Sequence, residues 1–247
     1  MRLPRMALLA VCLSAVAASA GPLQVRVGAD LDSLFVFRGS KRGSAGFVGR
    51  VGVTYGLTER LDFAANIWNF VELGNGVGFG EGQYDLGLRY RPPLIGSLAS
   101  LEGGWIYYDP TRQLDEISFG AENTMGRDTQ EWYLRLRLDL PGDPVIDLLQ
   151  DYDERVGTYF RVSAADRVRL RGPWSLDWQG SVGFDFGRGV DVYRDARVRG
   201  ALLYQIFPGL GVGPTFDLWF PSNQVDPNAD GITPVASFGF TYTPPQF

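Results

Sequence analysis

The sequence contains no histidine, a single cysteine and a single lysine. Because no imidazole is present, hydrolases and acyltransferases that use histidine as a general base are excluded. Cys12 lies close to the N-terminus, so the rest of the chain has no thiol for a disulfide framework or a cysteine metal site. The 23 basic and 28 acidic residues give a net charge of −5, which does not suggest a nucleic-acid partner. We expect a protein that is not an enzyme and needs no cofactor.

Long apolar runs are also missing, apart from one at the N-terminus. Two arginines precede an apolar stretch from Met6 to Ala18, and an Ala-Ser-Ala sequence stands before Gly21. This order is typical of a secretory signal with its cleavage site. The stretch is too short to cross a bilayer as a helix. We expect residues 1–20 to be a signal peptide and residues 21–247 to form one exported domain.

Strict alternation of apolar and polar residues recurs along the exported part of the chain. The clearest segment is residues 132–140, where apolar residues occupy the even positions and Arg135 and Arg137 lie among the odd ones. Placing so many charges in a dry core would cost on the order of several kcal/mol per ion, whereas a wet lumen avoids that cost. The pattern therefore favours an all-β fold, a single antiparallel transmembrane β-barrel, over a soluble periplasmic β-protein.

The connections between the alternating segments are short and long in turn. The short ones lie near residues 57–60, 91–97, 141–143, 171–173 and 207–209, and the longer ones near 39–45, 74–82, 109–129, 187–195 and 221–231. Outer-membrane barrels have short periplasmic turns and longer extracellular loops. We predict that this chain has the same arrangement.

Residues 144–152 fit two different structures. Asp143 before Pro144 resembles a helix cap, and Ile146 and Leu149 fit a helical stripe. If the segment is a strand, the barrel has twelve strands and both ends on the periplasmic side; if it is a helix, eleven strands remain. Single-chain bacterial barrels have even strand numbers, so we predict a strand and a twelve-stranded barrel.

The polar faces of the predicted strands carry both arginines and aspartates. We expect these charged residues to line the lumen: Arg26, Asp30, Arg50, Asp62, Asp85, Arg89, Arg135, Arg137, Asp147, Arg161, Asp177, Asp185, Arg197, Arg199 and Asp217. Carboxylate pairs on one strand face, such as Asp30 with Asp32, are better explained by a solvated wall than by catalysis. Because both signs are mixed along the wall, we expect weak ion selectivity.

One segment resembles part of a metal site. Asp226, Asn228 and Asp230 match the first half of a calcium loop, D-x-N-x-D-G. The position of the bidentate glutamate falls on Ser237, inside the predicted last strand. We therefore expect an ordinary turn and no metal at this place.

Phe35–Gly39 has the pattern aromatic-x-aromatic-Arg-Gly at the end of the predicted first strand. A second run has Tyr152-Asp153 followed by Gly157-Thr158-Tyr159-Phe160. Both runs resemble the TorF-type porin family of outer-membrane barrels. The resemblance implies a porin in the outer membrane of a Gram-negative bacterium.

The last segment of the chain alternates aromatic and small residues and ends at Phe247. This ending leads us to expect outer-membrane lipid and the barrel-assembly machinery as partners.

Two functions remain open. One is passive diffusion of small hydrophilic solutes or ions through an open lumen. The other is a plugged, non-conducting barrel that acts as a membrane anchor or binds through its surface loops, because inward charges of both signs suit either function.

Overall fold

The computed structural model describes residues 23–38, 40–73, 79–93, 95, 98–112, 129–152, 157–186, 193–222 and 231–244. In these parts the chain is all-β. The strands are β1 (Leu23–Asp32), β2 (Phe35–Phe37), β3 (Ser40–Gly43), β4 (Gly46–Gly56), β5 (Leu61–Glu72), β6 (Phe79–Tyr90), β7 (Ala99–Arg112), β8 (Thr129–Leu138), β9 (Val145–Asp151), β10 (Gly157–Arg169), β11 (Trp174–Phe186), β12 (Tyr193–Phe207), β13 (Leu210–Pro221) and β14 (Thr233–Tyr242). The described residues contain no helix that is long and apolar enough to cross a membrane.

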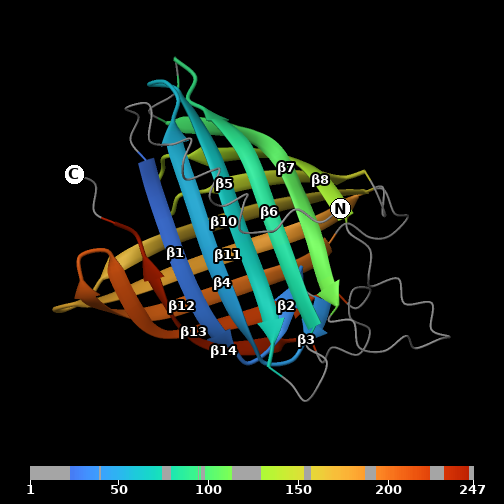
Figure 1. The fold of residues 1–247 in the computed structure, drawn as a ribbon, viewed down its shortest axis with the longest axis vertical. Coiled ribbons are helices and arrows are strands. Elements are labelled where there is room, and N and C mark those ends of the chain that lie inside the picture. The colour runs from blue at the N-terminus through green and yellow to red at the C-terminus, as the bar shows by residue number, and fades with distance from the viewer. Residues whose placement is uncertain are drawn as a thin grey trace, which may run out of the picture.

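Twelve of the strands close into one antiparallel barrel (Figure 1). Sequence neighbours pair around the wall, and β1 closes the sheet by pairing with β14 on one side and β4 on the other. For example, Val27 lies opposite Tyr242 of β14 and opposite Val51 of β4. The predicted all-β fold with twelve strands is confirmed.

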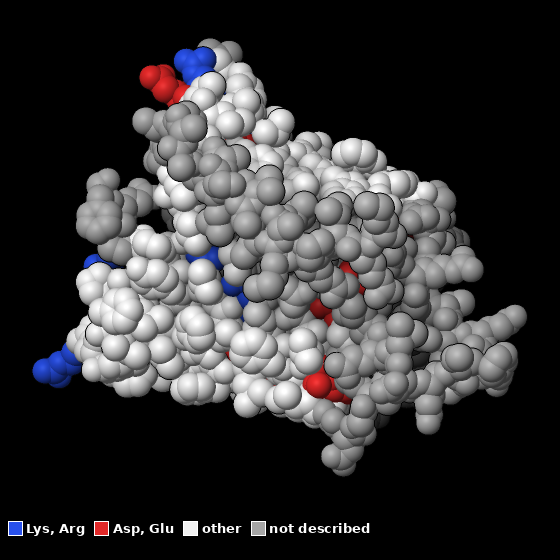
Figure 2. Space-filling model, viewed as in Figure 1, with Lys and Arg blue, Asp and Glu red and all other residues white. Residues whose placement is uncertain are grey.

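Alternation along each strand separates an apolar outer face from a polar inner face. Trp132, Leu134, Val198, Phe216 and Phe238 point outward, and each is more than half exposed. Figure 2 shows that most of the described surface seen from this side is uncharged, with a small number of charged residues at its edges and near its centre. Large exposed apolar areas are unfavourable in water, so this outer surface suits lipid.

β9 settles the ambiguous segment, because residues 145–151 form a strand that pairs with both β8 and β10. Asp143 and Pro144 belong to the connection before it rather than to a helix. Pro141 and Gly142 form a tight turn in which the Asp143 amide donates to the Leu140 carbonyl at 2.9 Å. Gly142 has φ 84°, a left-handed conformation that glycine adopts without strain.

The connections after β4, β6, β8, β10 and β12 lie at one rim and have 2 to 8 residues, whereas those at the other rim have 5 to 16. The predicted alternation therefore holds for the longest connections, such as 113–128, but the two sets overlap in length. We call the two rims the short-turn rim and the long-loop rim. β1 runs toward the long-loop rim and ends there at Asp32.

The prediction that Phe35–Gly39 ends the first strand was wrong. β1 ends earlier, and Phe35–Phe37 is β2, which pairs only with β3 in a separate two-stranded sheet. The aromatic residues explain the break, because Phe35 and Phe37 pack inside the barrel rather than continuing along its wall.

Candidate functional site

The β2–β3 hairpin connects β1 to β4 but lies inside the barrel near the long-loop rim (Figure 1). Phe35 is buried against Val48 of β4 and Phe70 of β5, which both occupy inner-face positions. The rings of Phe35 and Phe70 stack with centroids 4.4 Å apart. Gly46 leaves room for Phe70, since a Cβ there would lie 2.2 Å from that ring. The base of the hairpin is therefore fixed by apolar packing on the β4–β5 wall.

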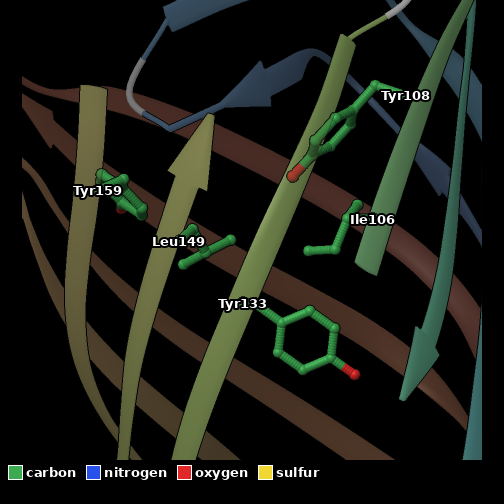
Figure 3. Packing of buried hydrophobic residues seen from close by; sticks show 5 residues of the cluster. All are labelled: Ile106, Tyr108, Tyr133, Leu149 and Tyr159. Atoms are coloured by element: carbon green, nitrogen blue, oxygen red, sulfur yellow. The ribbon is translucent and has the colours of Figure 1, made fainter. Parts of the chain in front are cut away.

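The tip of the hairpin reaches a second apolar cluster on another part of the wall. This cluster consists of Ile106, Tyr108, Tyr133, Leu149 and Tyr159, which project inward from β7, β8, β9 and β10 (Figure 3). Phe37 packs against both this cluster and the one around Phe35. A single side chain thus joins the β4–β5 part of the wall to the part that begins at β7, across β6.

Arg38 at the hairpin tip binds a carboxylate on the β8 part of the barrel wall. Its two terminal nitrogens donate to the two oxygens of Glu131 on β8 at 2.7 and 2.6 Å. Its Nη2 also donates to the Tyr108 hydroxyl at 3.0 Å, and that hydroxyl donates to Glu131 at 2.9 Å. Bidentate arginine–carboxylate pairs are stronger and more directional than simple ion pairs. This contact joins residues 93 positions apart in the sequence.

Aromatic rings surround the same guanidinium group. The Arg38 Cζ atom lies 4.5 Å from the ring centroid of Tyr159 and 5.0 Å from that of Phe37. Both distances suit a cation–π interaction. Arg38 also has φ 47°, a left-handed conformation that is uncommon for residues other than glycine. A left-handed conformation of this kind persists where surrounding contacts hold the residue in place. Here those contacts come from Glu131 and Tyr159 on the barrel wall.

A β-bulge in β12 supplies the last attachment. The β11–β12 register shifts between Gly183 and Phe184, so Arg194 has no partner of its own in the pairing. Arg194 donates from Nε to the Arg38 carbonyl at 3.3 Å and forms an ion pair with Asp185. Bulges re-aim side chains in this way. The wall is thus adapted to hold the hairpin.

The two runs that carried the family resemblance meet at this point. Arg38 comes from the first run and Tyr159 from the second, and they are in contact inside the barrel. Tyr159 in turn donates to Asp195 at 3.3 Å. The sequence did not show this meeting, because alternation within strands carries no information about a segment that folds back into the lumen.

The charged residues predicted from the sequence all lie on barrel strands, on the face opposite the exposed apolar residues. They are Arg26 and Asp30 on β1, Arg50 on β4, Asp62 on β5, Asp85 and Arg89 on β6, Arg135 and Arg137 on β8, Asp147 on β9, Arg161 on β10, Asp177 and Asp185 on β11, Arg197 and Arg199 on β12, and Asp217 on β13. The structure joins many of them in ion pairs.

The longest ion-pair network crosses five neighbouring strands, β6 to β10, and we call it the arginine ladder. Arg89 binds Glu102 at 2.7 Å, and Arg135 binds the other oxygen of Glu102 at 3.1 Å. Arg135 also binds Asp147 at 2.5 Å, and Arg161 binds Asp147 at 2.6 Å. Glu102 was missed in the sequence, because Gly103 and Gly104 after it interrupt the alternation.

The opposite part of the wall has shorter networks. Arg50 pairs with Asp30, and Arg199 approaches the same Asp30 oxygen at 3.9 Å. Arg197 pairs with Asp217 at 2.6 Å. Further pairs, which the sequence did not indicate, join Arg91 to Asp62 and Arg167 to Asp177.

Several predictions concern residues outside the described ranges. They are the signal peptide at 1–20, the calcium candidates Asp226, Asn228 and Asp230, and the terminal Phe247. Within the described ranges, no group of histidine, cysteine, aspartate and glutamate residues is arranged to hold a metal ion.

The barrel resembles known outer-membrane proteins. An outer-membrane channel from Pseudomonas putida F1 has 12% identity and a TM-score of 0.53, and the match covers 92% of this chain and 97% of that one. The translocator domain of the autotransporter NalP from Neisseria meningitidis has 14% identity, a TM-score of 0.47 and coverage of 96% and 93%. The KdgM porin has 12% identity, a TM-score of 0.44 and coverage of 89% and 98%.

Searches of protein-family models and of curated protein sequences found no match. At such low identities, the similarity to the Pseudomonas channel establishes the fold, and the function has to be argued from the lumen itself.

Proposed function

We propose that the protein is an outer-membrane channel of the TorF-type porin family, through which small hydrophilic solutes and ions diffuse passively. An apolar outer face around a charged lumen supports a location in the outer membrane of a Gram-negative bacterium. Lipid and the barrel-assembly machinery would be its partners there. The single observation that carries the proposal is the solvent exposure of inner-face charges toward the short-turn rim.

That exposure changes along the barrel axis. Arg26 and Arg137, near the short-turn ends of β1 and β8, are exposed although they lie on the inner face. The Arg161 side chain, further from that rim, keeps 37% exposure, and the Arg167 side chain nearer to it keeps 60%. Removing charged groups from water is costly even when they are paired. These exposed charges support a water-filled lumen on this side, as conduction requires.

The β2–β3 hairpin narrows the other side of the lumen. Its contacts with Phe70, Tyr108, Glu131 and Arg194 lie near the ends of strands at the long-loop rim. A solute would have to pass between this hairpin and the wall. We propose a channel with a wide, wet half and a constricted half, restricted to small solutes.

The same hairpin favours a second candidate, a closed barrel without conductance. Because the hairpin bridges the lumen from β4 and β5 to β7, β8, β10 and β12, its side chains could fill the cross-section completely. The protein would then act as a membrane anchor or bind through its surface loops.

Electrical recording from purified protein in a planar lipid bilayer separates the two candidates. A channel is expected to give small, uniform current steps in potassium chloride. Folding is checked by the shift in gel mobility on heating, which a closed β-sheet produces in detergent. Folded protein that carries no current at any voltage would exclude the channel and leave the closed barrel.

A further inference from the structure

Most ion pairs of the lumen wall expose the arginine more than its carboxylate partner; the exception among the described pairs is Arg194 with Asp185, at 13% and 17%. In the arginine ladder, the side chains of Glu102 and Asp147 are 1% exposed, whereas those of Arg89 and Arg161 are 22% and 37% exposed. Arginine is the longer side chain, so its guanidinium group covers the carboxylate that lies against the wall. The lumen surface of the ladder is therefore made by cations.

The opposite wall repeats this arrangement. Arg50 keeps 34% exposure over Asp30 at 6%, and Arg197 keeps 22% over Asp217 at 6%. The acidic residues neutralise part of the charge but are shielded from the lumen. The field that a passing ion meets depends most on the nearest groups, and these are guanidinium groups on both walls.

Within these two sets of ion pairs, the arginines outnumber the carboxylates that they bind. The ladder places Arg89, Arg135 and Arg161 on only two carboxylates, and Arg137 lies two positions along β8 from Arg135 on the same face. Among the described residues, Arg137 forms no ion pair within 4.0 Å. On the opposite wall, Arg199 shares with Arg50 a carboxylate oxygen that it approaches only at 3.9 Å.

From these observations we propose that the lumen selects anions, and that it binds small carboxylate-bearing solutes through Arg137 and Arg199. A guanidinium group without a short ion pair keeps its donors for a solute carboxylate, which it can hold in two parallel hydrogen bonds. The selectivity follows from pairing geometry and burial, because the sequence shows only that both signs are mixed. The proposal rests on the proposed channel function.

The test is the reversal potential of the wild-type channel under a gradient of potassium chloride, followed by addition of potassium citrate as the carboxylate probe. We expect chloride to be more permeant than potassium and citrate to reduce the chloride current. The variant Arg137→Gln with Arg199→Gln is expected to reduce both the chloride preference and the citrate effect. It removes no short ion pair, so the barrel should still fold.

A matched control carries Arg60→Gln and Arg171→Gln, which remove the same charge from the short turns outside the lumen. It should keep the selectivity and the citrate effect of the wild type. Glycerol at the same osmolarity checks that the block requires carboxylates. A conducting channel without chloride preference, or one whose preference both variants change equally, overturns this proposal alone. The absence of any current contradicts the channel function as well.

Discussion

At the scale of single residues, the ion pairs of the lumen wall differ widely in burial, and therefore in their contribution to stability. Glu102 accepts hydrogen bonds from Arg89, Arg135 and Tyr133 while its side chain is 1% exposed. Asp177 pairs with Arg167, but these two side chains are 31% and 60% exposed. Breaking a buried pair leaves charges without compensation, whereas exposed pairs contribute little.

Glu102→Gln should therefore destabilise the barrel strongly, by about 3–5 kcal/mol, because two arginines lose their shared carboxylate. Asp177→Asn is the matched control and should cost roughly 0–1 kcal/mol. Reversible urea unfolding in lipid vesicles, followed by tryptophan fluorescence, measures both. Equal losses of stability would mean that the ladder does not stabilise the wall.

At the scale of elements, the sequence predicted the strands well because each strand carries its own information. Side chains alternate across a strand, so β8 shows its lipid face and its lumen face in ten residues. β9 was predicted from the even strand number rather than from its own pattern. The bulge at Arg194 could not be predicted, because it depends on how β12 pairs with β11.

The two faces of β8 give a direct test of the orientation. Leu136→Arg places a charge on the outer face and should destabilise the barrel by about 2–4 kcal/mol if the site lies near the bilayer midplane. Arg137→Leu on the inner face is the control, since Arg137 forms no short ion pair among the described residues. Arg135→Leu is unsuitable, because Arg135 binds both Glu102 and Asp147. If Arg137→Leu is the more damaging change in vesicle unfolding, the faces are assigned the wrong way round.

At the scale of the whole molecule, the decisive feature is a hairpin that the strand pattern did not reveal. Its attachments, such as Arg38 to Glu131 and Arg194 to Arg38, join residues 93 and 156 positions apart. Short runs of sequence cannot show such contacts. The aromatic residues Phe35 and Phe37 were the visible sign of this hairpin in the sequence. Aromatic residues are equally common on a barrel wall at the membrane–water interface, so the two explanations could not be separated.

The barrel wall does not depend on the hairpin for its pairing. Asp32 of β1 and Gly46 of β4 lie directly opposite each other, so a two-residue Asn-Gly turn can replace residues 33–45. The shortened protein should still fold, as judged by the gel shift on heating, because all twelve wall strands keep their neighbours. Its single-channel conductance should rise by roughly several-fold, because an obstruction has been removed from the lumen.

The variant Arg38→Gln breaks only the contact with Glu131. It should give a smaller rise in conductance with more frequent current fluctuations, because the hairpin base remains packed on Phe70. If the shortened barrel folds and its conductance equals that of the wild type, the hairpin does not form the constriction.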